Sequence, residues 1–258
     1  MTAELEQSLW GALRELTAAR IGLRRAGASL ATAPLLEFKL AHARARDAVH
    51  ETLDEGRLLE DLAHLSVDTK AVASAAEDRQ RFLLRPDLGR RLGDGAEERL
   101  ATLRGDYDIV FVIADGLSAR AVQRHAQPLL AEVLPALREE GWRIAPIIVV
   151  RHGRVAIGDL IAVLLNTKCV AVLIGERPGL TAPDSMGVYL TWQPGPHITD
   201  ANRNCISNIR LDGLGYMKAS FKLIHLLHAM RAQGASGVQL KDDSESLQVC
   251  ISRPRQIK

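Results

Sequence analysis

Three short apolar runs lie in the second half of the chain, and each ends in a polar turn that contains glycine. They are YDIVFVIADG at residues 107–116, IAPIIVV at 144–150 and CVAVLIG at 169–175. Continuous runs of this length, rich in β-branched residues, are typical of parallel strands covered on both faces. Helical patterns lie between them, at 118–137 and 157–165. The sequence therefore predicts an α/β fold, with a Rossmann-like, doubly wound, mainly parallel sheet.

Two further elements complete this predicted domain. MGVYLTW, at residues 186–192, alternates polar and apolar positions more than the other runs, which favours an edge strand. A last helix is expected from residue 215, with Met217, Phe221 and Leu227 on its inner face and Gly234 as its C-cap. Ser118 is the expected N-cap of the helix between the first two strands. Pro128 is expected to break that helix, because proline lacks the backbone donor that the helix needs.

The first 92 residues form a predicted helical region. An amphipathic pattern covers residues 3–17, and Thr32, followed by Pro34, is the expected N-cap of a second helix. The segment LRPDLGRRL, at residues 84–92, combines proline, glycine and three arginines, as connectors do. We therefore predict two units: a helical N-terminal region over residues 1–92 and an α/β domain over residues 93–258.

Composition and cysteine spacing exclude several classes of protein. A net charge of +2 and an aromatic content of 4% argue against a nucleic-acid partner. Three cysteines far apart, without a CxxC pair, argue against a disulfide scaffold and against a structural zinc site. The charged N-terminus does not resemble a signal peptide, and NTK at residues 166–168 interrupts the most apolar segment. The sequence thus predicts a cytoplasmic protein that does not enter a membrane.

The turns after the three strands are the expected ligand-binding edge, since ligands of such sheets bind beyond the carboxyl ends of the strands. No G-x-G-x-x-G or P-loop lysine motif occurs there, which argues against nicotinamide and ATP. Asp115, Ser118 and His125 could be imagined as a catalytic triad, but turn and cap roles explain the first two better. His225 and His228 lack a third ligand at suitable spacing, so a metal site is not predicted.

Two polar segments keep alternatives open. Glu176, in the segment GERPG, either pairs with a nearby arginine or contacts a ligand. RNCISNIR, at residues 203–210, is either a polar loop or strand, or a wall for a polar ligand. In the second case Cys205 is a small, polarizable contact rather than a nucleophile.

A series of motifs in this order resembles one family, the small (light) subunits of ethanolamine ammonia-lyase. The motifs are LRPDLGRRL, IADGLSA, VVRHGRVAIGD, VLIGERPGL, DSMGVYLTW and RNCISNI. Each motif is weak by itself, but the series is specific, and the resemblance covers residues 18–241.

The resemblance implies an adenosylcobalamin-dependent lyase that converts ethanolamine to acetaldehyde and ammonia by a radical mechanism. It implies base-on cobalamin, which agrees with the absence of a D-x-H sequence from this chain. It also implies that the substrate site lies in a large subunit, a TIM barrel, and that the small subunit closes the cobalamin site at the interface. The expected assembly is a hetero-oligomer, a trimer of units with two large and two small subunits.

By motif, the family's cobalamin contacts fall on Val155, Glu176 and Cys205 of this sequence. The resemblance implies no catalytic residue and no metal ligand in this chain. Some family members carry an N-terminal segment linked to packaging in a bacterial microcompartment, and this chain is expected to lack it. The C-terminal tail from Asp242 matches no family motif.

Two alternative functions remain open from the sequence. One is a non-catalytic module that binds cobalamin or a nucleotide, and the other is an independent Rossmann-like enzyme. Neither would need a large subunit for its function.

Overall fold

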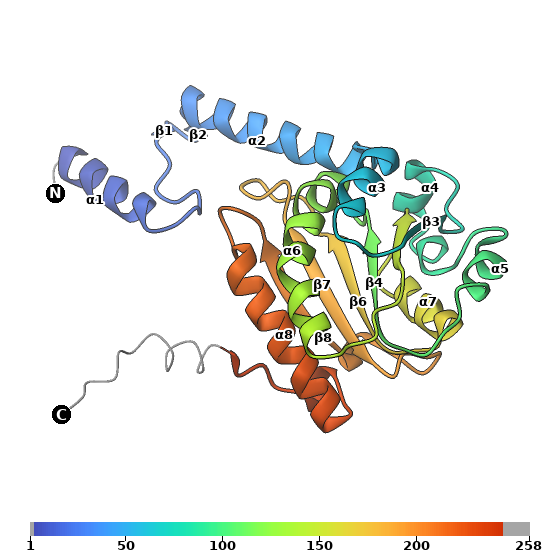
Figure 1. The fold of residues 1–258 in the computed structure, drawn as a ribbon. Helices are drawn as coiled ribbons and strands as arrows, with labels where there is room; N and C mark the ends of the chain where they lie inside the picture. The colour runs from blue at the N-terminus through green and yellow to red at the C-terminus, as the bar shows by residue number, and fades with distance from the viewer. Residues whose placement is uncertain (1–2, 245–258) are drawn as a thin grey trace, which may run out of the picture.

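The chain is built on a six-stranded sheet with the strand order β3-β5-β4-β6-β7-β8 (Figure 1). The computed structural model describes residues 3–244. The strands that pair in parallel are β3 (Thr69–Ala73), β5 (Ile147–Arg151), β4 (Tyr107–Ala114) and β6 (Thr167–Gly175). The antiparallel strands are β7 (Met186–Trp192) and β8 (Arg203–Ile209). The predicted α/β fold with a mainly parallel sheet is confirmed.

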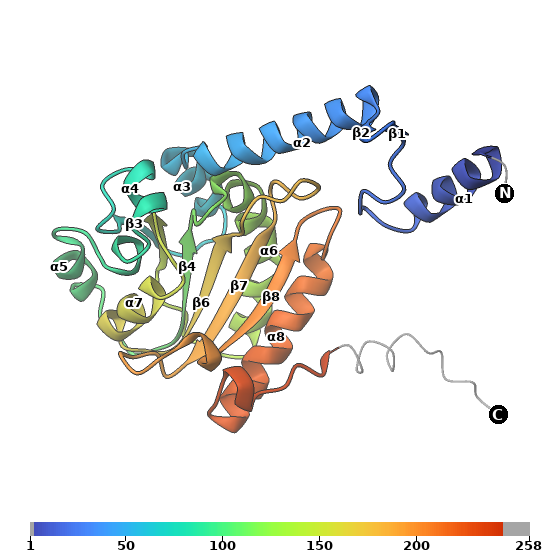
Figure 2. The ribbon, with the colours of Figure 1, turned by 180° about the vertical axis from the view of Figure 1, so that it is seen from behind.

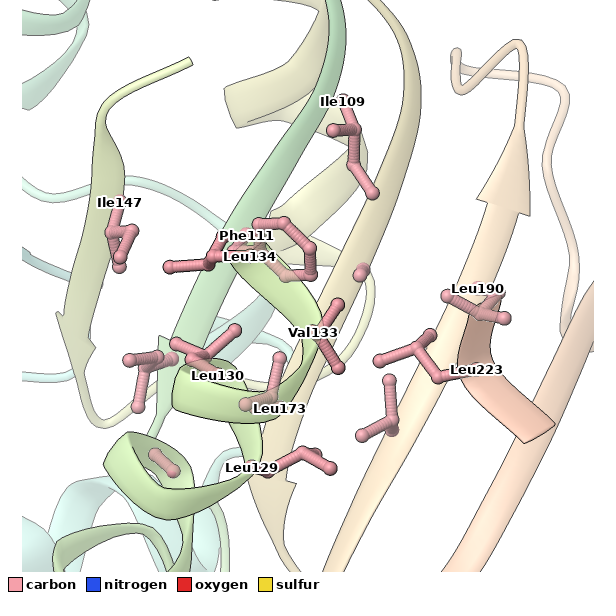
Figure 3. Close-up of a cluster of buried hydrophobic side chains, with 14 of the residues drawn as sticks. Ile109, Phe111, Leu129, Leu130, Val133, Leu134, Ile147, Leu173, Leu190 and Leu223 are labelled. Atoms are coloured by element: carbon pink, nitrogen blue, oxygen red, sulfur yellow. The ribbon is translucent and has the colours of Figure 1, made fainter. Parts of the chain in front are cut away.

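Helices cover both faces of the central strands, as a doubly wound sheet requires. On one face lie α6 (Ala119–Glu139) and α8 (Tyr216–Gln233), and on the other lie α5 (Ala96–Ala101) and α7 (Ile157–Leu165) (Figures 1 and 2). Alternate residues of β4 point to opposite faces of the sheet, where they pack in two separate hydrophobic cores. Phe111 packs on the α6 side together with Leu130 and Leu223 (Figure 3), and Val112 packs on the α7 side. Burial on both faces explains why the strand sequence is apolar throughout.

The N-terminal elements lie along and beyond one edge of these layers (Figures 1 and 2). They are α1 (Ala3–Glu15), β1 (Arg25–Ala26), β2 (Ser29–Leu30), α2 (Thr32–His50), α3 (Glu55–Ala63) and α4 (Arg79–Leu84). Three short 3-10 helices lie elsewhere in the chain, at Leu88–Arg90, Asp200–Asn202 and Gly237–Gln239. Helix α2 crosses above the carboxyl ends of the parallel strands, whereas α1 lies apart from the sheet.

The region 1–92, predicted as helical, also contains strand β3, whose residues pair in parallel with β5. A five-residue strand is too short to show a distinct hydrophobic period, and its neighbour in the sheet lies some eighty residues further along the chain. The division of the chain at residues 92 and 93 stays a prediction.

Strand β7 is not an edge strand, because β8 pairs with its outer side, so β8 is the edge. Helix α6 is not broken at Pro128 but runs through both Pro128 and Pro135. Its buried face, which includes Leu129 and Val133, packs against the sheet and offsets the hydrogen bonds that the prolines remove.

Two local predictions, on Thr32 and Met217, are also wrong, and a third, on Ser118, is right only in part. The N-cap of α2 is Ala31 rather than Thr32. Ser118 is the N-cap residue of α6, as predicted, but its hydroxyl donates to the Pro183 carbonyl at 3.1 Å instead of to a backbone amide of the helix. Met217 is 80% exposed, so it does not lie on the inner face of α8. The end of α8 at Gly234, in the left-handed conformation, is confirmed.

Candidate functional site

The ends of strands β4 and β6 meet with almost no space between their backbones. The Leu117 amide donates to the Gly175 carbonyl at 2.9 Å. A Cβ atom placed on Gly175 would lie 2.0 Å from the Ser118 carbonyl oxygen, so only glycine fits at this point. The direction in which the chain leaves β6, and therefore the place of Glu176, follows from this contact.

The ends of β4 and β5 are joined through Asp115. Its buried carboxylate accepts from Arg79 Nη1 at 3.3 Å and from the Gly153 amide at 3.2 Å. Burial raises the pKa of Asp115, while Arg79 and the backbone amides oppose that shift. The predicted convergence of the three strand-end turns at one edge is thus confirmed.

The residues of the imagined triad are not brought together. Asp115 binds Arg79, Ser118 binds Pro183, and His125 Nδ1 lies 2.8 Å from the Tyr216 hydroxyl on the α8 side of the sheet. These contacts are structural, and they leave no nucleophile paired with a base.

Glu176 is held by two donors from strand β8. The Ser207 hydroxyl donates to Glu176 Oε1 at 2.5 Å, and the backbone amide of Asn208 donates to Glu176 Oε2 at 3.2 Å. The pairing of β7 and β8 is irregular here, and Asn208 has a φ of 60°, a conformation that asparagine tolerates better than most residues. Among the described residues, no arginine pairs with the Glu176 carboxylate, which disfavours the plain ion pair.

Cys205 lies near the same carboxylate, opposite Tyr189 in the pairing of β7 and β8. Burial raises the pKa of Tyr189 to about 12, and Cys205 and Glu176 add to the shift. Burial also raises the pKa of the Cys205 thiol, although a hydrogen bond with Tyr189 opposes this. A thiol that stays protonated at neutral pH suits a contact residue and not a nucleophile.

These side chains lie on a face of the sheet that no described helix covers. We call Gly187, Tyr189, Cys205 and Ser207 the open face. Their neighbours in the two strands, such as Val188 and Ile206, point into the core beneath α6 and α8. Figure 2 shows β7 and β8 from this side, with α7 lying only over the strands further inside the sheet.

Val155 borders the open face at the start of α7. Its half-buried side chain packs against the same core layer as Tyr189. It also lines a cavity of about 380 Å³, together with Arg90, Arg154 and Arg203. The structure therefore brings Glu176 and Cys205 into one cluster and places Val155 along the same side of the sheet.

The sequence motifs did not point to Tyr189, Ser207, Arg154 or Arg177 as parts of a site. Arg154 directly precedes Val155 and Arg177 directly follows Glu176, so adjacency to two predicted contacts was the available signal. Tyr189 and Ser207 carried no such signal, because their positions depend on how β8 pairs with β7.

The remaining candidate groups show no further site. Over residues 3–244, no cluster of three or more His, Cys, Asp or Glu side chains could hold a metal ion. His225 pairs with Asp243 at 2.7 Å, and His228 pairs with Glu140 at 2.5 Å.

Both described cysteines, Cys169 and Cys205, are free. Cys250 and the tail from residue 245 lie outside the described residues. In the described part of the chain, no helix is both long and apolar enough to span a bilayer.

Comparison with known proteins gives a consistent result along nearly the whole chain. The profile of the ethanolamine ammonia-lyase light chain family matches residues 7–241. The small subunit of ethanolamine ammonia-lyase from Xanthomonas campestris pv. campestris is 52% identical over 240 residues, which cover 92% of this chain and 88% of that protein. The small subunit from Ralstonia nicotianae is 50% identical over 248 residues, covering 94% and 92%. That from Pseudomonas aeruginosa is 48% identical over 240 residues, covering 92% and 88%. The chain therefore belongs to the family of ethanolamine ammonia-lyase small subunits.

Proposed function

We propose that this chain closes the adenosylcobalamin site of an ethanolamine ammonia-lyase, at the interface with the large subunit. Membership in the family makes the chain a subunit of a heteromeric lyase and implies a large-subunit partner. The proposal adds the cofactor, the radical deamination of ethanolamine to acetaldehyde and ammonia, and a substrate site in a large TIM-barrel subunit. It also adds an assembly of three units, each with two large and two small subunits.

The observation that carries the proposal is the position of Glu176, Cys205 and Val155 on the uncovered side of the sheet. Glu176 offers carboxylate oxygens that accept hydrogen bonds, Cys205 offers a protonated thiol, and Val155 offers methyl groups. The rim of a corrin ring carries amide donors and methyl groups, which match these three kinds of contact. The carboxylate, thiol and methyl groups of these three residues therefore fit a large, mainly uncharged ligand.

Each residue has a limited role in this proposal. When bound, adenosylcobalamin supplies a carbon-centred radical by homolysis of its cobalt–carbon bond. Glu176, fixed by Ser207 and Asn208, would accept a hydrogen bond from an amide or hydroxyl group of the cofactor. Val155 and the ring of Tyr189 would exclude water from its apolar surface. No residue of this chain is assigned to move a proton or to contact ethanolamine.

The experiment that tests the function is coexpression with a large subunit of the same family. The two chains should copurify, and the complex should release acetaldehyde from ethanolamine when adenosylcobalamin is added. The purified small subunit alone should release none. Acetaldehyde from the small subunit alone would place the chemistry in this chain and overturn the proposal.

Replacing Glu176 by alanine tests the cofactor site itself. A hydrogen bond to a charged group contributes about 1.5–3 kcal/mol, so the cobalamin dissociation constant of the complex should rise about tenfold or more. The matched control is Glu132→Ala, because Glu132 is exposed on α6, on the other side of the sheet. An unchanged cobalamin dissociation constant in the Glu176 variant would show that Glu176 does not contact the cofactor.

The alternatives give different results in the same experiments. A non-catalytic cobalamin- or nucleotide-binding module would bind the cofactor without raising lyase activity. An independent enzyme would bind a nucleotide and act without the large subunit.

A further inference from the structure

Two cavities at the carboxyl edge of the sheet share a wall made by Arg154 and Pro86. The first, of about 380 Å³, also has Arg90 and Val155 in its lining. The second, of about 470 Å³, has Arg46 of α2 and Arg177, which directly follows Glu176. We call Arg90, Arg154 and Arg177 the arginine groove.

Arg154 is fixed in place while part of its guanidinium stays without a partner. Its guanidinium carbon lies 4.1 Å from the centre of the Phe82 ring, and its Nη2 donates to the Phe82 carbonyl at 3.3 Å. Its Nε is buried and has no hydrogen-bond partner. A buried donor without a partner is costly in a native protein, so its presence at a cavity wall points to a ligand.

The first cavity has one carboxylate in its lining, Asp200, and that group already pairs with Arg203 Nε at 3.6 Å. Burial is the main cause that lowers the pKa of Arg154, and the like charges of Arg79, Arg90 and Arg177 add to it. The carboxylate that opposes this shift, Asp115, already accepts from Arg79. In the lining of the second cavity, the described residues include no aspartate or glutamate.

Within the described part of the chain, three other arginines near this edge have carboxylate partners, unlike Arg90 and Arg177. Arg85 and Arg91 both contact Asp87, at 2.8 Å and 3.3 Å, and Arg120 contacts Glu51 at 2.6 Å. For Arg90 and Arg177, both exposed, no ion pair is found among the described residues. Two guanidinium groups without an ion pair, and a third whose Nε has no partner, thus line the two cavities.

We propose that the arginine groove is an anion site that binds the phosphodiester of the cobalamin nucleotide loop. This inference rests on the proposed function, because it takes cobalamin as the ligand of the adjoining open face. The phosphodiester is the anionic group at the cobalamin periphery, where the other polar side chains are amides. Planar guanidinium groups bind phosphate oxygens through paired, charge-assisted hydrogen bonds. Val155 lines the first cavity, and Arg177, which directly follows Glu176, lines the second, so one ligand can reach both regions.

The test uses the complex of both subunits and three cofactor forms. Adenosylcobalamin and adenosylcobinamide phosphate carry the phosphate, and adenosylcobinamide lacks it together with the ribose and base. Dissociation constants are measured by absorbance titration for the wild type, Arg177→Gln, Arg90→Gln and the double variant. The matched control is Arg91→Gln, because Arg91 neighbours Arg90 but is paired with Asp87 and lines neither cavity.

The double variant should bind both phosphate-bearing forms at least about tenfold more weakly, the loss of one charged hydrogen bond, and adenosylcobinamide unchanged. Equal weakening of all three forms, or no weakening of any, would overturn the phosphate site. Weaker association of the two subunits without cofactor would also overturn it, because the groove would then bind an acidic surface of the large subunit.

The same titrations separate this inference from the proposed function. If Glu176→Ala weakens cobalamin binding while the arginine variants do not, only the phosphate site is wrong. If the complex binds no cobalamin, or binds it without dependence on Glu176, the proposed cofactor site itself is wrong.

Discussion

At the scale of single residues, glycine at the end of β6 decides where Glu176 can lie. The turn that follows β4 passes so close to Gly175 that a Cβ atom there would lie 2.0 and 2.6 Å from the Ser118 and Asp115 carbonyl oxygens. Both obstacles are backbone atoms at the ends of buried elements, so they cannot move aside cheaply.

Gly175→Ala is therefore expected to lower the free energy of unfolding by about 1–3 kcal/mol, as overpacking does, and to displace Glu176. Urea unfolding of the small subunit measures the first effect. The control is Gly11→Ala in α1, where the added Cβ would meet nothing within 4 Å. Alanine is the better helix former, so the control should not be destabilised. Equal stability of the two variants would contradict the close approach described above.

At the scale of elements, Asp108 fixes the opposite edge of the sheet, where β4 begins. Its buried carboxylate accepts from Lys168 Nζ at 2.8 Å, at the start of β6, and from Arg143 Nη2 at 3.1 Å, just before β5. The Arg143 hydrogen bond is the largest cause that holds the pKa of Asp108 well below its usual range, against the effect of burial. One side chain thus ties together the starts of three strands.

A lowered folded-state pKa means that this stabilisation is present above the unfolded pKa of about 3.9 and is lost as the pH falls below it. Asp108→Asn should lower the free energy of unfolding at pH 7 by about 1.5 kcal/mol, the low end for such bonds because both cations are half exposed. The variant should also lose less stability than the wild type between pH 4 and pH 2. Urea midpoints at pH 7 and pH 3 measure both effects. Asp212→Asn, at a carboxylate 93% exposed, is the control. Parallel pH profiles for the wild type and the Asp108 variant would show that this carboxylate does not carry the acid sensitivity.

At the scale of the whole molecule, the N-terminal elements divide into an outlying helix and a docked one. Helix α1 lies apart from the sheet in both views, and Arg14 Nε donates only locally, to the Ile21 carbonyl at 3.0 Å (Figures 1 and 2). Helix α2 is docked, since Ala48 is fully buried and the Val49 carbonyl accepts from Arg79 Nε at 2.7 Å.

Removal of residues 1–24 should therefore leave the melting temperature of the small subunit within a few degrees of the full chain. Removal of residues 1–50 should lower it clearly, because Arg79 loses a buried acceptor and the core loses Ala48. Differential scanning calorimetry of the two truncated chains makes the comparison. A large loss on the shorter truncation would show that α1 stabilises the sheet.

The sequence by itself determined the elements whose signals are local. The three buried strands, helix α7 with its bounds at Ile157 and Leu165, and the end of α8 at Gly234 follow from apolar runs, hydrophobic periods and a terminal glycine. The motif series also carried the family. The signal for each element lies within some twenty residues, and the family signal is the order of short motifs along the chain, so neither depends on distant contacts.

Only the tertiary structure decided how distant segments meet. It paired β3 with β5 and β8 with β7, left one face of β7 and β8 without a helix, and placed the Ser207 and Asn208 donors on Glu176. It also gathered Arg90, Arg154 and Arg177 along one groove. Contacts between residues far apart in the chain depend on strand order and register, and the local pattern of side chains does not encode these. Glu176 was therefore visible in the sequence as a charge at a strand end, while its surroundings were not.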